Sequence, residues 1–214
     1  MKLYSYFRSS AAFRVRIALN LKGAAYETIP VHLLRGGGDQ LADSFVQINP
    51  AALVPVLEDG GQVLTQSLAI IEYLDERFPD PALLPGDALS RAYVRSVALS
   101  IACDIHPLNN LRVLRYLVRD LHISDEAKTA WTRHWIEHGL GQLERYMVAC
   151  GRSGQFALGD RVTIADLAIT PQIFNARRLE CDLDQAPTLR AIADRCMQLD
   201  AFIRAQPAAQ PDAE

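Results

Sequence analysis

Residues 49–77 read NPAALVPVLEDGGQVLTQSLAIIEYLDER, and this stretch decides the fold of the first part of the chain. Two short apolar runs, Val54 to Glu58 and Gln62 to Thr65, flank the turn Asp59-Gly60-Gly61, an arrangement typical of a β-hairpin. The run from Ser67 to Arg77 is apolar at helical spacing and predicts a helix. The stretch therefore predicts a strand–strand–helix unit.

The residues before this stretch predict the order strand, helix, strand, helix. Residues 2–7 alternate and are rich in aromatic side chains, which suits a strand, and Phe13 to Lys22 is an amphipathic run that predicts a helix. Tyr26 to His32 predicts a second strand, and Leu41 to Ile48 predicts a short helix. Together with the hairpin and its helix, these elements predict an α/β domain over residues 1–80.

The residues after this stretch predict a second domain that is all-α. Residues 78–87 contain three prolines and a glycine and are expected to form a linker. Residues 88–206 carry helical periodicity, whereas residues 207–214 are Pro, Ala, Gln and acidic residues without periodicity and predict a flexible tail. The expected helices are about Ser90 to Leu121, Asp125 to Cys150, Thr163 to Leu179 and Leu189 to Ala205.

Composition narrows the class of function. The net charge is −3 and no Lys/Arg-rich run is present, so we expect no nucleic-acid partner. The start has no apolar core of signal-peptide length, and no apolar run approaches the roughly 18 residues of a membrane span, so we expect a cytoplasmic protein without a membrane partner. Four widely spaced cysteines are interpreted as buried apolar filler, with one reactive cysteine as the alternative: Cys103, Cys150, Cys181 and Cys196.

The run Arg8-Ser9-Ser10-Ala11-Ala12-Phe13-Arg14-Val15-Arg16-Ile17-Ala18-Leu19 resembles the zeta class of glutathione transferases, the maleylacetoacetate and maleylpyruvate isomerase family. In that class, serines stand between the first strand and the first helix. The resemblance implies a thioredoxin-like glutathione-binding domain followed by a helical domain that binds substrate. It covers essentially residues 2–206.

Serine at this position has a physical rationale. A hydroxyl at a helix start can donate to a thiolate, and the helix dipole favours negative charge there, so both lower the pKa of a bound thiol from about 8.5. Ser9 is the candidate activator and Ser10 its assistant, with Arg8 in the same loop. The simpler alternative is that the serines only cap the helix.

Two more motifs resemble glutathione-binding segments of the superfamily. Residues 49–57 resemble the segment in which a proline after valine is cis, which would leave the backbone of Val54, beside Pro55, open to pair with an extended peptide. Gln66-Ser67 resembles the pair that holds the γ-glutamyl carboxylate at a helix start. An edge-strand proline and a plain N-cap are the alternatives. Gln40 matches the position that holds the glycine end of glutathione.

The helical half resembles the class in three segments. Thr163 and Asp166 resemble an N-capping box, whose role is in folding. The other two segments, residues 104–112 and 171–178, resemble substrate-binding helices. Arginines at matching positions are expected to hold a dicarboxylate substrate through bidentate hydrogen bonds. The substrate-binding candidates are Arg8, His106, Asn110, Arg112 and Arg178. A surface salt bridge is the alternative role for each arginine, Arg115 could take the place of Arg112, and a merely packed imidazole is the alternative for His106.

The resemblance implies a glutathione-dependent cis–trans isomerase of maleylacetoacetate or maleylpyruvate, usually a homodimer, in the degradation of aromatic amino acids or aromatic acids. Relatives commonly carry cysteine where Ala11 stands, so chemistry that needs a second thiol is not expected. A broader transferase acting on α-haloacids or other electrophiles, and a catalytically silent module, are the alternatives. His134 and His138 have the spacing of a zinc pair but no evident third ligand, so no metal site is expected.

Overall fold

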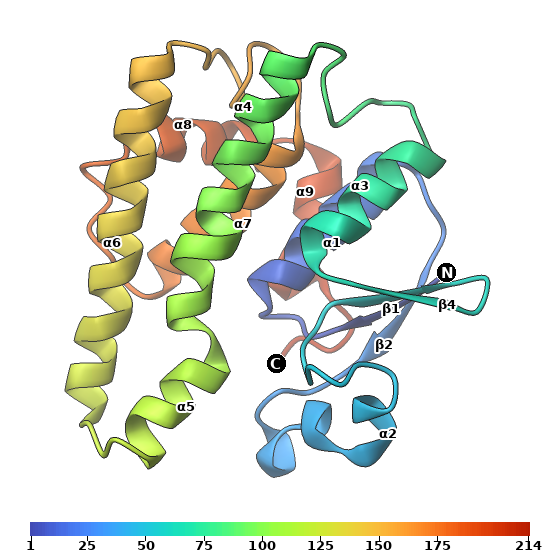
Figure 1. Ribbon diagram of the computed structural model, residues 1–214, viewed down its shortest axis with the longest axis vertical. Coiled ribbons are helices and arrows are strands. Elements are labelled where there is room, and N and C mark those ends of the chain that lie inside the picture. The colour runs from blue at the N-terminus through green and yellow to red at the C-terminus, as the bar shows by residue number, and fades with distance from the viewer. The chain divides into compact units, whose positions relative to one another are not determined.

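Four short strands form one mixed sheet in the order β2-β1-β3-β4 (Figure 1). The strands β1 and β2 are parallel, whereas β3 is antiparallel to both β1 and β4. Parallel pairing requires a crossover connection, and helix α1, Ser10–Leu21, supplies it. The strands are β1 Lys2–Ser5, β2 Glu27–Pro30, β3 Val56–Asp59 and β4 Gln62–Thr65. All four lie where the sequence predicts them.

The computed structural model describes all 214 residues, which divide into two units. The first unit is Met1–Leu83 together with Gln198–Glu214, and the second is Leu84–Met197. Besides α1, the helices of the first unit are the short helices η1 Arg35–Gly37, η2 Asp39–Leu41 and α2 Asp43–Val46, then α3 Ser67–Arg77, α9 Asp200–Ala205 and η5 Pro207–Ala209. Helix α1 contacts both α3 and α9, and it buries Phe13, Val15 and Ile17 completely or nearly so.

The C-terminal end differs from the expected division, which assigned residues 88–206 to the helical domain and residues 207–214 to a flexible tail. In the structure, Gln198–Glu214 belongs to the first unit. The side-chain amide of Gln210 is buried and donates to the backbone oxygens of Arg204 and Gln206 at 2.8 and 3.0 Å. Composition did not predict that the C-terminal residues pack on the first unit, because the residues that contact Asp212 and Glu214 lie near the start of the chain.

The second unit is built from helices only. Helix α7, Ile164–Arg178, is buried along most of its length and contacts α4, α6 and α8. At its start, the Asp166 carboxylate accepts hydrogen bonds from the backbone N–H groups of Thr163 and Ala157, both at 2.7 Å. The predicted capping box is thus confirmed. The other helices are α4 Ala88–Leu99, η3 Ser100–Ile105, η4 His106–Asn109, α5 Leu111–Arg119, α6 Asp125–Cys150 and α8 Pro187–Cys196.

Two expected helices are interrupted. The stretch predicted as one helix from Ser90 to Leu121 changes to a π turn at Ser100, to a 3-10 turn at His106, and to extended backbone at Asn110, where α5 begins. Pro107 lacks a backbone N–H and therefore cannot continue an α-helical ladder. The stretch from Leu189 to Ala205 likewise breaks between α8 and α9, where Leu199 is extended.

The cysteines are less uniform than predicted. Burial raises the pKa of the Cys196 thiol and raises that of the Cys181 thiol to about 11, so both remain thiols at neutral pH. Cys103 and Cys150, however, are exposed, which contradicts their interpretation as buried filler. Cys150 is the last residue of α6, and Cys103 lies in the π turn, two positions whose side chains face solvent. No helix in the chain is both long and apolar enough to span a membrane.

Candidate functional site

The turn after β1 carries the two serines. Ser9 is the N-cap of α1, with φ −69° and ψ 115°, and the backbone N–H of Ala12 donates to its Oγ at 3.2 Å. The capping alternative is therefore correct as far as geometry goes. It does not compete with the proposed role, because a hydroxyl oxygen that accepts one hydrogen bond keeps its own proton for another acceptor. Ser10, the first residue of α1, is buried.

A buried arginine fixes this turn, and sequence reasoning did not single it out. Arg16 is fully buried on α1, and its guanidinium donates to the backbone oxygens of Phe7 at 3.0 Å and Ala205 at 2.8 Å and to Ser5 Oγ at 3.0 Å. Burial lowers its pKa to about 10, which leaves the group charged at neutral pH. Its signal in the sequence was a charged side chain, like that of Arg14, among the apolar residues of the predicted helix, a pattern typical of a buried cation with several acceptors.

The Val54–Pro55 peptide bond is cis, as the resemblance implies. The preceding turn is held by Asn49, whose Nδ2 donates to the Leu53 oxygen at 2.7 Å, while Ala51 N–H donates to Asn49 Oδ1 at 3.1 Å. Val54 makes none of the backbone hydrogen bonds of this turn and lies just outside the β3 ladder. Its backbone can therefore pair with an added extended peptide.

The start of α3 has unfilled hydrogen-bonding capacity. Gln66 is the N-cap in position, with φ 67°, but its side chain makes no capping hydrogen bond, so the plain N-cap alternative fails. The first N–H groups of the helix then have no intrahelical acceptor, and the helix dipole favours an anion there. The Oγ of Ser67 accepts a hydrogen bond from the buried Arg14 side chain at 3.3 Å, which adds positive charge. Sequence reasoning missed Arg14 as well.

These segments lie at one end of the sheet. Val56 pairs with Tyr4 and with Thr65, so the end of β1, the start of β3 and the end of β4 are neighbours. The turn with Ser9 follows β1, the Val-Pro segment precedes β3, and Ser67 follows β4. A serine hydroxyl at a helix start, an open backbone and an anion-favouring helix start thus occur together.

Gln40 is the exception among the glutathione-binding candidates. Its side chain is buried, and its Nε2 donates to the Leu33 oxygen at 3.5 Å, while Oε1 has no hydrogen-bond partner. Its assignment to the glycine end of glutathione stays a prediction. Arg8 differs in the opposite sense, because it is exposed and its guanidinium lies 4.9 Å from the centre of the Phe7 ring.

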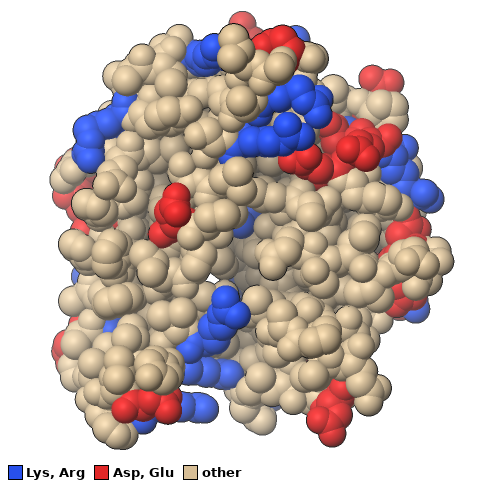
Figure 2. All heavy atoms as spheres, viewed as in Figure 1, with Lys and Arg blue, Asp and Glu red and all other residues tan.

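The helical unit holds the remaining candidates. His106 and Asn110, four residues apart, do not lie on one helix, because Asn110 is extended and caps α5 by accepting the Arg112 N–H at 3.1 Å. Arg112 is exposed and has no ion pair, and Lys and Arg atoms gather over the α5 side of this unit (Figure 2). Arg178 donates to Asn175 at 2.8 Å, whereas the neighbouring Arg177 forms an ion pair with Asp194 at 2.7 Å.

The two histidines of α6 lie with their rings stacked. The ring centres of His134 and His138 are 5.8 Å apart, and the planes differ by 13°. The chain contains no group of three or more His, Cys, Asp or Glu side chains placed to hold a metal ion.

Known proteins match both the first domain by itself and the chain as a whole. Residues 3–82 match a family model described as the N-terminal domain of glutathione S-transferases. The chain is 49% identical over 211 residues to a probable maleylacetoacetate isomerase from Vibrio cholerae. The aligned region covers 99% of this chain and 97% of the relative.

Two solved structures cover all of this chain and are themselves covered completely. One is the holo structure of a maleylpyruvate isomerase, a bacterial glutathione S-transferase in the zeta class, with a TM-score of 0.96 and 47% identity. The other is a maleylacetoacetate isomerase from Methylobacterium extorquens AM1 with bound malonate and GSH, with a TM-score of 0.96 and 40% identity.

A mixed four-stranded sheet with this site at one end, followed by a helical unit, defines the glutathione S-transferase class. The chain belongs to this family, within its zeta class of maleylacetoacetate and maleylpyruvate isomerases.

Proposed function

We propose that this protein is a glutathione-dependent cis–trans isomerase that converts a maleyl β-diketo acid, maleylacetoacetate or maleylpyruvate, to its fumaryl isomer. The observation that carries the proposal is the Ser9 hydroxyl at the start of α1, which accepts from Ala12 N–H and keeps its proton for a thiolate. Membership of a family whose relatives bear these isomerase names supports the choice of reaction.

The residues present fit glutathione. The open backbone of Val54 suits the cysteinyl peptide groups, and Gln66 with the α3 start suits the γ-glutamyl carboxylate. Pro55 sets the course of the chain at Val54 through its cis bond. Bound glutathione would supply a thiol whose thiolate adds to the double bond, permits rotation about the resulting single bond, and leaves again.

The protein's own groups would hold charge during this reaction. The Ser9 hydroxyl donates to the sulfur and favours its charged form, and the N-terminal dipole of α1 acts in the same sense. Ser10 assists as the first residue of that helix. The exposed guanidinium of Arg8, one residue before Ser9, is the group we assign to a substrate carboxylate and to the enolate oxygen that becomes negative.

In the helical unit we assign substrate carboxylate binding to Arg112 and Arg178 and keep His106 and Asn110 as further contacts. Arg112 is exposed and has no competing ion pair, and the Arg178 guanidinium donates to the side-chain oxygen of Asn175 at 2.8 Å. Arg177 is a weaker candidate, because its Asp194 pair would have to open. A relative solved with malonate, itself a dicarboxylate, together with GSH supports a dicarboxylate substrate.

We also propose that the protein acts in the cytoplasm as a homodimer, which rests on the family resemblance. A sedimentation mass near twice the 23.7 kDa of one chain is the expected result, and a mass of one chain would contradict the dimer.

A spectrophotometric assay of maleylacetoacetate and maleylpyruvate, each with and without glutathione, tests the proposed reaction. We expect fumaryl product only when glutathione is present. Conjugation of haloacids without isomerisation would instead favour the broader transferase. Retention of glutathione with neither activity nor a lowered thiol pKa would favour a silent module.

A further inference from the structure

The turn that carries Arg8 and Ser9 is short and closed. Ser9 N–H donates to the backbone oxygen of Tyr6 at 2.9 Å, so residues 6–9 form a four-residue turn between β1 and α1. The orientation of the Ser9 hydroxyl therefore depends on how the peptide groups within this turn are held.

The Phe7 peptide groups are held on both sides by charged side chains, one from the nearby helix α1 and the other from the C-terminal segment. The Phe7 oxygen accepts from the buried Arg16 guanidinium at 3.0 Å. The Phe7 N–H donates to Oδ2 of Asp212 at 3.0 Å, across 205 residues of sequence. Asp212 also acts on Arg16 itself, since burial lowers the pKa of Arg16 while Tyr26 and Asp212 oppose that shift. One buried cation and one carboxylate thus bracket the turn.

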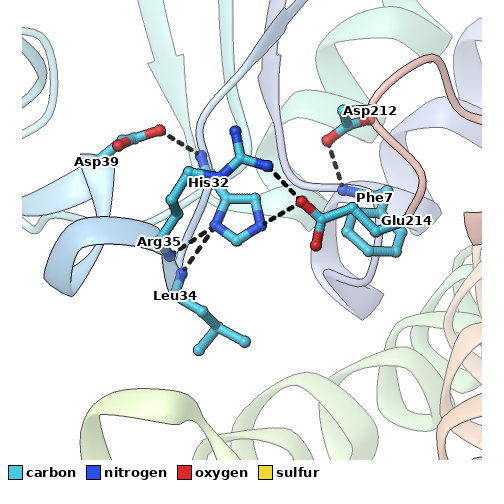
Figure 3. Close-up of polar contacts among 7 residues, drawn as sticks. All are labelled: Phe7, His32, Leu34, Arg35, Asp39, Asp212 and Glu214. Atoms are coloured by element: carbon cyan, nitrogen blue, oxygen red, sulfur yellow. Dashed lines mark hydrogen bonds and ion pairs between the residues drawn. The ribbon is translucent and has the colours of Figure 1, made fainter.

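The chain brings Asp212 to this place through contacts on either side of it. On one side, the buried Gln210 amide holds the end of α9. On the other side, the Glu214 carboxylate pairs with Arg35 and lies 3.4 Å from His32 Nε2 (Figure 3). The Nδ1 of His32 accepts from the Arg35 N–H at 2.8 Å, which leaves Nε2 facing Glu214.

We propose that Asp212 is a positioning residue for the active-site turn: its carboxylate fixes the Phe7 peptide and thereby the orientation of Ser9. This inference rests on the proposed function, because it takes Ser9 as the donor to the glutathione sulfur. Asp212 is not assigned a contact with glutathione or substrate. Its effect should therefore appear in the reaction rate and in the thiol pKa rather than in glutathione affinity.

The test compares Asp212→Ala with Asp212→Asn in the full-length protein. Alanine removes the acceptor, so we expect kcat to fall about tenfold or more, since misplacing a catalytic group by about 1 Å can cost a hundredfold. The pKa of the bound glutathione thiol should rise, and the glutathione Kd should change less than about threefold. Asparagine keeps a neutral acceptor that is roughly half as strong, so its values should lie between those of wild type and alanine.

Glu214→Gln is the matched control. It removes the negative charge in the same C-terminal segment but keeps a side-chain oxygen that can accept from Arg35, so the segment and its Phe7 contact should stay in place. We expect wild-type kcat and thiol pKa from this variant. Amide hydrogen exchange at Phe7 should be faster in Asp212→Ala than in wild type or in Glu214→Gln.

Unchanged kcat and thiol pKa in Asp212→Ala would overturn the inference, and so would an equal effect of Glu214→Gln. If Asp212→Ala does not fold, wild-type values for Asp212→Asn in all readouts would overturn it instead. If the wild-type protein isomerises neither maleyl compound, the proposed function fails separately. Thiol pKa and Phe7 exchange then still decide the role of Asp212.

Discussion

Replacing Ser9 with alanine separates two roles of one hydroxyl. The variant loses the cap on α1, in which Ala12 N–H donates to Oγ at 3.2 Å, and loss of a serine cap costs about 1 kcal/mol of stability. For a chain of this length that corresponds to a fall of about 2–4 °C in Tm. The variant also loses a hydrogen bond to a charged sulfur, worth about 1.5–3 kcal/mol. We therefore expect turnover to fall by about ten- to a hundredfold.

The chain offers a matched control in Ser124, the N-cap of α6. Its Oγ accepts from Ala127 N–H at 3.1 Å, nearly the same geometry as at Ser9, and it lies in the helical unit. Ser124→Ala should therefore lower Tm by a similar amount. Because this serine has no proposed contact with sulfur, turnover should stay at the wild-type level.

Thermal denaturation, initial rates of isomerisation and ultraviolet titration of the bound thiol give the three readouts. We expect the thiol pKa to rise by about one to two units in Ser9→Ala and to stay unchanged in Ser124→Ala. If Ser9→Ala matches Ser124→Ala in all three, then Ser9 is only a cap, and activation of the thiol must come from Ser10 or from the helix end.

Arg8→Met and Arg178→Met should each raise KM for the dicarboxylate about ten- to a hundredfold, because each would lose a charge-assisted hydrogen bond. In the same two variants, the rate of conjugation of an uncharged chlorodinitroarene should change little, and Arg177→Met, the control, should keep the wild-type KM for the dicarboxylate. Equal losses of activity with both substrates would instead indicate that Arg8 and Arg178 support the glutathione site or the fold. Burial raises the pKa of Asp166 to about 6, so between about pH 4 and pH 6 the folded protein holds a proton that the unfolded chain releases. Stability from this group is therefore present near pH 4 and lost as pH rises through 6, and the difference in unfolding free energy between wild type and Asp166→Asn should be about 2–3 kcal/mol larger at pH 4 than at pH 7. Urea titrations at both pH values measure it, and a difference independent of pH would contradict the shift.

Local patterns predicted most of the first unit and part of the site. Strands, turns and the helix from Ser67 to Arg77 depend on alternation and spacing over a few residues, and these signals are complete within each segment. The serine turn and the Val54–Pro55 bond could be predicted because their motifs are contiguous. The break at Asn110 could have been anticipated, because Pro107 lies inside the run that was interpreted as one helix.

The rest of the site depends on contacts between distant parts of the sequence. Arg16 and Asp212 act through the Phe7 peptide, and no periodicity connects residue 7 with residue 212. Residues 207–214 combine prolines with acidic side chains, a composition typical of disorder. Their ordered structure could be predicted only with knowledge of the residues that they contact, such as Phe7 and Arg35. The hydrogen bond from the Gln40 side chain to the Leu33 oxygen is a similar case, because motif position does not predict side-chain contacts.

The first unit is discontinuous in sequence, and this sets an order of events during synthesis. Met1–Leu83 emerges from the ribosome first, but α9, which contacts α1, emerges only after Leu84–Met197 has been made. At translation rates of about 5–20 residues per second, the nascent sheet and its helices wait on the order of ten seconds for that contact. During this interval the acceptor at Ala205 is missing for Arg16, and the surface of α1 that α9 later covers is open to chaperones.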